Sequence, residues 1–306
     1  MPIVKANGIN IEVEEFGRKS DPTVLLIMGL AAQLTLWPKS FIDKLVEARL
    51  HVVRFDNRDI GLSEKLHSKR APHPATAMTA IRLFGLKALA PYTLHDMAAD
   101  SVGVLDALGV KSAHIVGVSM GGMIGQLIAA DYADRVKSFT AIMSNTNNRR
   151  LKQADPRIMK ELFGSQPRAR SRDELIDRTI KIWDTIGSPN GGNDPIEFRQ
   201  KVADSIDRCT YPTGVHRQIA AILATGDLRR WTQKIGAPSL VIHGSVDPLS
   251  PKEGGLDIAA NIKNARAEII DGMAHDLPPK FLPRITELVL GHIRAVEDGA
   301  TKTRAA

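Results

Sequence analysis

The sequence predicts an α/β fold: a central, mostly parallel sheet with helices on both faces and an inserted helical cap. Short runs rich in valine and isoleucine alternate with amphipathic stretches over most of the chain. The alternation stops between residues 146 and 232, where only helical periodicity remains. A chain of 306 residues is long enough for one α/β domain with such an insertion.

The strands are predicted from the spacing of their apolar residues. Residues 9–17 alternate apolar and charged side chains, as a strand with one exposed face does. The remaining runs are continuously apolar, which is typical of strands buried on both faces of a parallel sheet. These runs are "TVLLIMG" (23–29), "HVVRFDN" (51–57), "AHIVGVS" (113–119), "SFTAIMS" (138–144), "SLVIHGS" (239–245) and "AEIIDGM" (267–273).

Helices are predicted between these strands and after the last one. They cover residues 41–50, 94–108, 122–134, 252–262 and 281–296. Thr93 can cap the helix over 94–108, with Asp96 at the matching position of a capping box.

The insertion is predicted to be entirely helical. Its apolar residues fall on three helical faces: Ile176, Ile180, Trp183 and Ile186; Phe198, Val202, Ile206 and Cys209; and Val215, Ile219 and Ile222. We therefore expect a core of residues 1–145 and 233–306, with residues 146–232 as a cap over the carboxyl edge of the sheet.

A second, smaller insertion covers residues 64–92. It contains "PATAMTAIRLFGLKALAP", a weakly amphipathic helical stretch with a proline at each end. We interpret it as a flap over the same edge of the sheet, with a membrane-surface helix as the alternative.

The net charge of +7 is concentrated in the two insertions. Residues 146–232 carry 16 Lys and Arg against 11 Asp and Glu, and residues 64–92 carry 5 against 1. Neither segment interleaves aromatic residues with its charges or matches a nucleic-acid motif, so we expect no nucleic-acid partner. Solvated helix faces are favoured over a field that steers a charged substrate.

Cysteine content and hydropathy narrow the class of protein further. The single cysteine, Cys209, excludes internal disulfides and a cysteine-rich zinc site. No secretory signal pattern is present, and no apolar run approaches the ~18 residues that span a bilayer. We expect a cytoplasmic protein without a membrane span. The sequence indicates no particular oligomeric state.

Ser119 is the candidate nucleophile. It lies in "GVSMG", between a predicted strand and a predicted helix, with Gly117 and Gly121 on either side. A chain that reverses direction there strains the backbone of Ser119 and projects its hydroxyl outward, and side chains at the two glycines would collide with their neighbours. A dinucleotide-binding loop is excluded because "GVSMGGMIG" contains no G-x-G.

For a serine at a strand-to-helix elbow of this kind, the acid and then the histidine follow it in the chain. Four histidines follow Ser119, and only His275 lies in a loop directly after the last predicted strand. Asp247 follows the preceding strand in a turn fixed by prolines, "HGSVDPLSP" (243–251). The loop over 144–150 has no carboxylate, and Asp276 is interpreted as a surface or capping residue.

An oxyanion hole requires two backbone N–H groups. We expect them from Met120, directly after the nucleophile, and from Leu30, after the "TVLLIMG" strand. Candidates for lining the substrate pocket are Trp37, Met143, Leu249 and Met273. A lone apolar residue is more often part of the core than a substrate contact.

These motifs resemble those of the α/β-hydrolase fold superfamily. The similar segments are "GVSMGG", "HGSVDPLSP", "GMAHDLP" and "RFDNRDIGLS", and "IMGLAAQLTLWP" extends the resemblance to bacterial serine esterases typified by aclacinomycin methylesterase. The resemblance implies a triad of Ser119, Asp247 and His275, with Leu30 and Met120 as oxyanion donors. The His-Gly pair common in such oxyanion loops is Met28-Gly29 here, and we interpret Asp56 and Arg58 as structural residues beside that loop.

The expected activity is hydrolysis of a small-molecule carboxylic ester, a methyl ester or a lactone included, through an acyl-enzyme. This chemistry requires no metal and no organic cofactor. A serine at the elbow argues against haloalkane dehalogenase and epoxide hydrolase chemistry, which use aspartate there. The alternatives are a cofactor-free perhydrolase or haloperoxidase, an acyltransferase or carbon–carbon hydrolase, and a ligand-binding receptor of the same fold.

Overall fold

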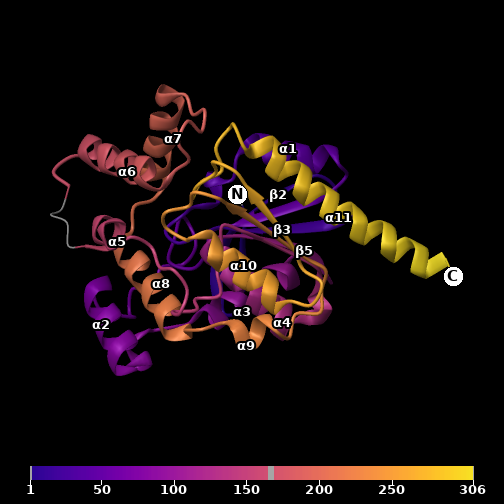
Figure 1. Ribbon diagram of the computed structural model, residues 1–306, viewed down its shortest axis with the longest axis horizontal. Coiled ribbons are helices and arrows are strands. Elements are labelled where there is room, and N and C mark those ends of the chain that lie inside the picture. Colours follow the sequence, from indigo (N-terminus) through magenta and orange to yellow (C-terminus); the bar gives the residue numbers. More distant parts are fainter. Residues whose placement is uncertain (1, 165–168, 306) are drawn as a thin grey trace.

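The computed structural model describes residues 2–164 and 169–305, and in them an eight-stranded sheet lies between layers of helices (Figure 1). The strand order is β1-β2-β4-β3-β5-β6-β7-β8, in which β3 to β8 run parallel and β1 and β2 run antiparallel. The strands are β1 (Ile3–Ala6), β2 (Ile9–Phe16), β3 (Thr23–Ile27), β4 (His51–Phe55), β5 (Ala113–Val118), β6 (Val136–Ile142), β7 (Ser239–Gly244) and β8 (Arg266–Ile270). The predicted mostly parallel sheet is confirmed.

Strand β1 was not predicted from the sequence. It forms a hairpin with β2 through Asn7 and Gly8, whose φ angles are 49° and 82°. An Asn-Gly pair is a strong hairpin signal because both positions need a positive φ. The strand has only four residues and one fully buried side chain, so its apolar pattern is too short to detect.

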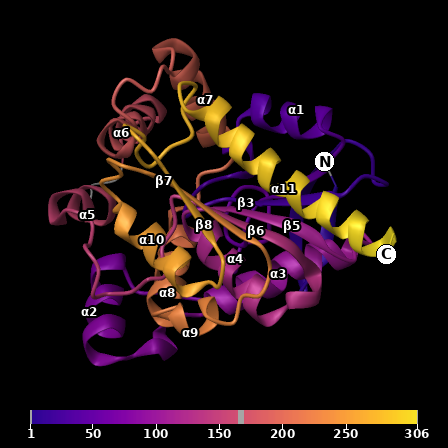
Figure 2. The ribbon, with the colours of Figure 1, turned by 45° about the vertical axis from the view of Figure 1, so that its right-hand side comes forward.

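Helices cover both faces of the sheet, as predicted (Figure 2). On one face lie α1 (Lys39–Glu47) and α11 (Leu282–Ala305), the latter longer than the predicted 281–296. On the other face lie α3 (Leu94–Ala107), α4 (Met120–Asp131), α9 (Arg229–Thr232) and α10 (Lys252–Asn261). The capping box of Thr93 and Asp96 at the start of α3 is present.

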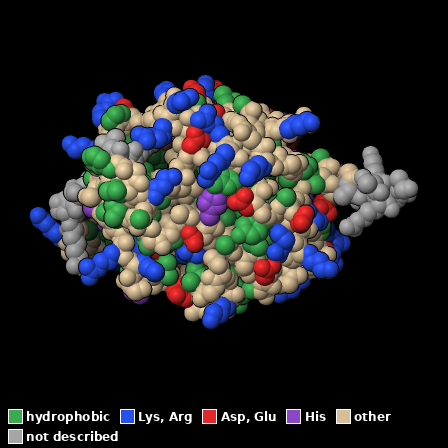
Figure 3. Space-filling model, turned by 90° about the horizontal axis from the view of Figure 1, so that it is seen from below, with side chains coloured by type: hydrophobic (Ala, Val, Ile, Leu, Met, Phe, Trp, Pro, Cys, Tyr) green, Lys and Arg blue, Asp and Glu red, His purple; other side chains and the backbone are tan. Residues whose placement is uncertain are grey.

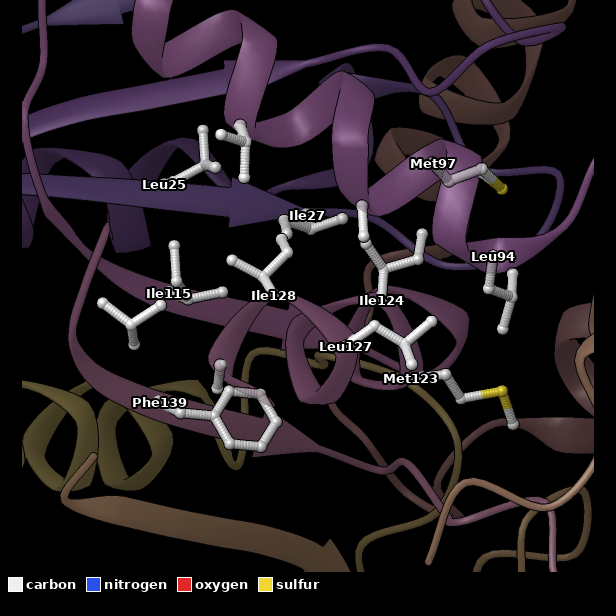
Figure 4. Close-up of a cluster of buried hydrophobic side chains, with 14 of the residues drawn as sticks. Leu25, Ile27, Leu94, Met97, Ile115, Met123, Ile124, Leu127, Ile128 and Phe139 are labelled. Carbon is white, nitrogen blue, oxygen red and sulfur yellow. The ribbon is translucent and has the colours of Figure 1, made fainter. Parts of the chain in front are cut away.

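The hydrophobic core is therefore divided in two by the sheet. Val24 and Leu26 of β3 pack with α1 and α11, while Leu25 and Ile27 pack on the opposite face. Figure 4 shows the cluster on this opposite face, in which Ile124 and Ile128 of α4 lie beside Ile27 of β3. Helix α4 is buried along nearly its whole length, so its first turn is held rigidly at the end of β5.

In the described part of the chain, five helices separate β6 from β7; α9 lies against the core, and the other four gather at one end of the sheet (Figure 1). They are α5 (Pro156–Phe163), α6 (Arg172–Ile186), α7 (Pro195–Arg208) and α8 (Pro212–Thr225). The last three follow the predicted apolar faces, whereas α5 was not predicted separately. The exact boundaries of core and cap stay a prediction.

The smaller insertion forms α2 (Pro74–Phe84), which packs on α8. Ala77 and Ile81 of α2 contact Ala220 and Ala224 of α8. The helix ends earlier than the stretch up to residue 91 suggested, because Gly85 adopts a left-handed conformation with φ 68° and caps it. Short 3₁₀ turns occur at η1 (Leu34–Leu36), η2 (Lys87–Leu89) and η3 (Ala133–Arg135).

Within the described ranges, no helix combines the length and the apolar character that crossing a membrane requires. On the face shown in Figure 3, Lys and Arg side chains are scattered, with Asp and Glu side chains between them. This distribution is consistent with solvated helix faces.

His114 makes the stability of this fold depend on pH. Its ring nitrogens lie 2.8 Å from Ser138 Oγ and 3.0 Å from Glu297 Oε1 of α11, and its side chain is fully buried. Burial lowers the pKa of His114 to about 4, against about 6.5 in an unfolded chain. Between these values the unfolded chain takes up a proton that the folded chain does not, so the free energy of unfolding falls as the pH falls.

We expect His114→Gln to weaken this dependence. Urea unfolding at pH 7 and pH 5 should show wild-type protein losing about 1–2 kcal/mol that the variant retains. His67→Gln, at an exposed position, serves as the control and should leave the pH dependence unchanged. Identical slopes for wild-type protein and His114→Gln would contradict the prediction.

Candidate active site

Ser119 connects β5 to α4, and its backbone has a conformation that residues other than glycine rarely adopt. Its φ is 54° and its ψ is −118°. A Cβ atom at Gly117 would overlap the carbonyl of Gly121, and one at Gly121 would overlap the carbonyl of Ile27. Only glycine permits this approach, so the two glycines allow the turn that raises Ser119 at the carboxyl end of the sheet.

The structure brings Ser119, His275 and Asp247 into one hydrogen-bonded chain. His275 Nε2 lies 3.0 Å from Ser119 Oγ, and His275 Nδ1 lies 2.7 Å from Asp247 Oδ2. A carboxylate only accepts, so Nδ1 carries the proton and Nε2 is left to accept from the serine hydroxyl. This is the arrangement that a serine nucleophile with a general base requires.

Asp247 is held in its ionised form. Burial alone would raise the pKa of Asp247, but the neighbouring His275 and His243 outweigh it and hold this pKa well below its usual range. Its Oδ1 also accepts from the backbone N–H groups of Leu249 and Ser250, at 3.0 and 2.8 Å. The carboxylate therefore stays charged and fixed in orientation.

In the described residues, none of the other three histidines after Ser119 is hydrogen-bonded to its hydroxyl, although His243 Nε2 lies 3.4 Å from Asp247 Oδ2. His243 is fully buried in β7, donates from Nε2 to the carbonyl of Ser250 at 2.6 Å, and so supports the turn that carries Asp247. His216 lies in α8 and His292 in α11.

The candidate oxyanion donors lie on two adjacent strand ends. Ile27 of β3 pairs with Gly117 of β5, which brings the loop that contains Leu30 beside Ser119. A Cβ placed on Gly29 would lie 3.1 Å from Ser119 Cβ. Within the described part of the chain, the N–H groups of Leu30 and Met120 donate to no protein acceptor. Both are thus available to a ligand.

The four candidate pocket residues divide into two groups. Trp37, Met143 and Met273 are almost completely buried in the core cluster on the α1 and α11 side. Core packing accounts for them, and their contact with substrate stays a prediction. Leu249 is half-buried and lines a cavity of about 90 Å³ together with Met123 and Asn145.

Asp56 and Arg58 have different partners. Asp56 Oδ1 accepts from the N–H of Leu34 at 2.7 Å, as expected of a residue that holds the oxyanion loop. Arg58 instead forms a buried, two-pronged ion pair with Asp100 of α3, at 2.5 and 2.6 Å. Its side chain therefore joins the loop after β4 to α3, and its role in holding the oxyanion loop stays a prediction.

The inserted helices contact the site through residues that the sequence analysis missed. The N–H of His275 donates to the carbonyl of Ile186 at 3.0 Å, and Asp276 accepts from the N–H of Ser188 at 3.0 Å. Asp276 thus caps the loop after α6. Gln218 of α8 is hydrogen-bonded to the oxyanion loop. The feature of the sequence that could have identified it is a polar residue on the otherwise apolar helical face of Val215 and Ile219.

No cluster of His, Cys, Asp and Glu in the described residues has the arrangement of a metal site. The groups that converge on Ser119 are a base, a carboxylate and backbone amides. Their chemistry is that of acyl transfer.

A family model described as alpha/beta hydrolase fold matches residues 22–279. Rhodomycin D methylesterase of Streptomyces peucetius is 28% identical over an alignment of 315 positions, which covers 96% of this chain and 98% of that protein. 3-Oxoadipate enol-lactonase 2 of Acinetobacter baylyi is 23% identical, with 87% and 86% of the two chains covered.

Solved structures give the same fold. The enol-lactonase from Burkholderia xenovorans LB400 matches with a TM-score of 0.70 at 22% identity, covering 96% of this chain and 100% of that one. The meta-cleavage product hydrolase of Pseudomonas fluorescens IP01 matches with a TM-score of 0.75 at 17% identity, covering 96% and 98%. The predicted fold class and the resemblance to bacterial esterases are confirmed, and the named methylesterase and enol-lactonase agree with the predicted carboxylic ester hydrolase.

Because Gly121 lies so close to the carbonyl of Ile27, one added methyl group at this position should destabilise the protein strongly. Gly121→Ala should lower the free energy of unfolding by about 2–4 kcal/mol, because the new Cβ meets backbone atoms that cannot move aside. Gly291→Ala is the matched control: its Cβ would meet nothing within 4 Å in α11, so helix propensity should raise stability by about 0.5–1 kcal/mol. Urea unfolding of both variants measures the difference, and equal stabilities would refute the steric account.

Proposed function

Because the chain belongs to the α/β-hydrolase fold family, we propose that it is a serine esterase that hydrolyses a small-molecule carboxylic ester through an acyl-enzyme on Ser119. The single observation that carries the proposal is the hydrogen-bonded chain from Ser119 through His275 to Asp247. The partial exposure of Ser119 supports it further, since a nucleophile must be reached by its substrate.

In the first half of the reaction, His275 Nε2 takes the hydroxyl proton as Ser119 Oγ attacks the carbonyl carbon of the ester. The carbonyl π electrons move to its oxygen, and the N–H groups of Leu30 and Met120 bind the oxyanion. When the tetrahedral intermediate collapses, the bond to the alcohol oxygen breaks and that oxygen takes the proton from Nε2. Asp247 stabilises the imidazolium throughout.

The second half repeats these steps with water in place of serine. His275 removes a proton from water, the hydroxide attacks the acyl-enzyme, and Ser119 Oγ leaves with the proton that Nε2 returns. In a lactone the alcohol is part of the same molecule, so ring opening follows the same course. The methylesterase and enol-lactonase relatives favour esters and lactones as the substrate class.

We expect Ser119→Ala to reduce p-nitrophenyl ester hydrolysis by at least about 1,000-fold while the thermal midpoint stays nearly constant. A fluorophosphonate probe should label wild-type protein at Ser119 and fail to label the variant. Ser101→Ala, at a buried serine of α3 whose hydroxyl donates to the carbonyl of Met97 in the same helix, is the control and should retain turnover. Turnover that survives in Ser119→Ala would mean that another residue makes the attack.

Asp247→Asn should lower kcat by about 10⁴-fold, because an amide can donate to Nδ1 and then favours the wrong histidine tautomer. Asp271→Asn, an exposed carboxylate at the end of β8, should lower it by less than twofold. The measurement is kcat at pH 8 with the same ester. Comparable kcat values for the two variants would remove Asp247 from the proposal.

A substrate panel separates the rival activities. We expect hydrolysis of methyl esters and of lactones of graded acyl length, with free acid as the product. Halogenation that depends on peroxide would indicate a perhydrolase, and transfer of the acyl group to an added alcohol would indicate an acyltransferase. A receptor would bind ligands without turnover and would resist the fluorophosphonate.

A further inference from the structure

Gln218 is a fully buried glutamine on α8 whose side chain hydrogen-bonds to two backbone groups of the core. Its Oε1 accepts from the N–H of Ala31 at 3.1 Å, and its Nε2 donates to the carbonyl of Arg58 at 3.0 Å. An N–H can only donate and a carbonyl can only accept, so these two partners fix which end of the amide is which. The side chain thus has one satisfied orientation.

Ala31 directly follows Leu30 and has a φ of 62°, a conformation that costs alanine on the order of 1 kcal/mol. This conformation needs support from its surroundings, and the Ala31 N–H receives it by donating to Gln218 Oε1. On the other side of Leu30, Asn57 Nδ2 donates to the carbonyl of Met28 at 3.0 Å. The peptide that carries the Leu30 N–H is therefore bracketed by two side-chain hydrogen bonds.

The same loop is held at a third point further along. Gln33 Nε2 donates to the carbonyls of Ser205 and Cys209 in and after α7, at 2.6 and 3.0 Å, and Arg208 donates to Gln33 Oε1 at 2.6 Å. The inserted helices are thus hydrogen-bonded to the loop at residues 31 and 33. Of these two contacts, the one made by Gln218 is adjacent to Leu30.

We infer that Gln218 is a positioning residue for the oxyanion hole: through Ala31 it sets the direction of the Leu30 N–H toward the carbonyl oxygen of the substrate bound at Ser119. The inference rests on the proposed function, and it makes helix α8 of the insertion part of the apparatus that stabilises the transition state. An aligned donor matters most when the oxygen carries full charge, so loss of Gln218 acts on kcat and not on KM.

The test replaces Gln218 with leucine, which removes both hydrogen bonds at similar volume, and with methionine, which also keeps the unbranched shape. We expect kcat for a p-nitrophenyl ester to fall about 10- to 100-fold, with KM changed less than threefold. The inhibition constant of an alkyl trifluoromethyl ketone, whose adduct with Ser119 places an oxyanion in the hole, should rise by the same factor as kcat falls. Replacing a residue that merely stabilised the fold would not change kcat and the inhibition constant by the same factor.

Thr225→Val is the matched control. Thr225 lies on the same helix and its Oγ1 accepts from the N–H of Leu94 at 2.9 Å, so it joins α8 to the core away from the oxyanion loop. It should lower the thermal midpoint while kcat and ketone inhibition stay within twofold of wild-type values.

Two failures are distinguishable. Wild-type protein that neither turns over esters nor reacts with the fluorophosphonate refutes the proposed function. Wild-type protein that does both, while Gln218→Leu or Gln218→Met keeps full kcat and full ketone affinity, refutes the role of Gln218 alone. A KM change without a kcat change in these variants also overturns it.

Discussion

The site depends on one steric constraint, the contact between the first turn of α4 and the carbonyl of Ile27 at the end of β3. That contact is possible only because residue 121 is glycine, and it leaves Ser119 with a backbone conformation that costs roughly 1–3 kcal/mol. The strain persists because α4 is buried almost throughout and cannot retreat from the sheet. Burial of α4 in the cluster of Figure 4 thus supplies the rigidity that the exposed hydroxyl needs.

A second layer of constraint joins the inserted helices to the loop after β4. Arg217 of α8 and Asp59 are both fully buried and share two hydrogen bonds, at 2.6 and 2.8 Å, and Tyr92 donates to the same carboxylate at 2.8 Å. Removing one partner of such a pair leaves an uncompensated buried charge, which typically costs 3–5 kcal/mol. The ion pair fixes where α8 lies, and the position of α8 in turn decides where Gln218 can reach.

The residues that could be predicted from sequence are those with a local signature. Ser119 lies in a five-residue pattern, and Asp247 and His275 follow recognisable strands, so knowledge of a parallel sheet brings their ends together. Strand β1 and the end of α2 were missed although Asn7, Gly8 and Gly85 indicate turns there, because the prediction relied on the apolar pattern. Gln218, Gln33 and Ser188 could not be placed, because their partners depend on how a helical insertion folds back over the sheet.

The hydrogen bond between Ser188 and Asp276, the residue after His275, restricts how a ligand gains access to Ser119. Lifting α8 together with the loop after α6 would break the contacts of Arg217, Gln218 and Ser188 at once, at roughly 1 kcal/mol for each hydrogen bond. Helix α5 is tied to α6 instead, since its Glu161 pairs with Lys181 at 3.1 Å and accepts from Thr185 Oγ1 at 3.3 Å. An opening that moved α8 would therefore lose several contacts at the same time, whereas a change confined to α5 would leave those contacts intact.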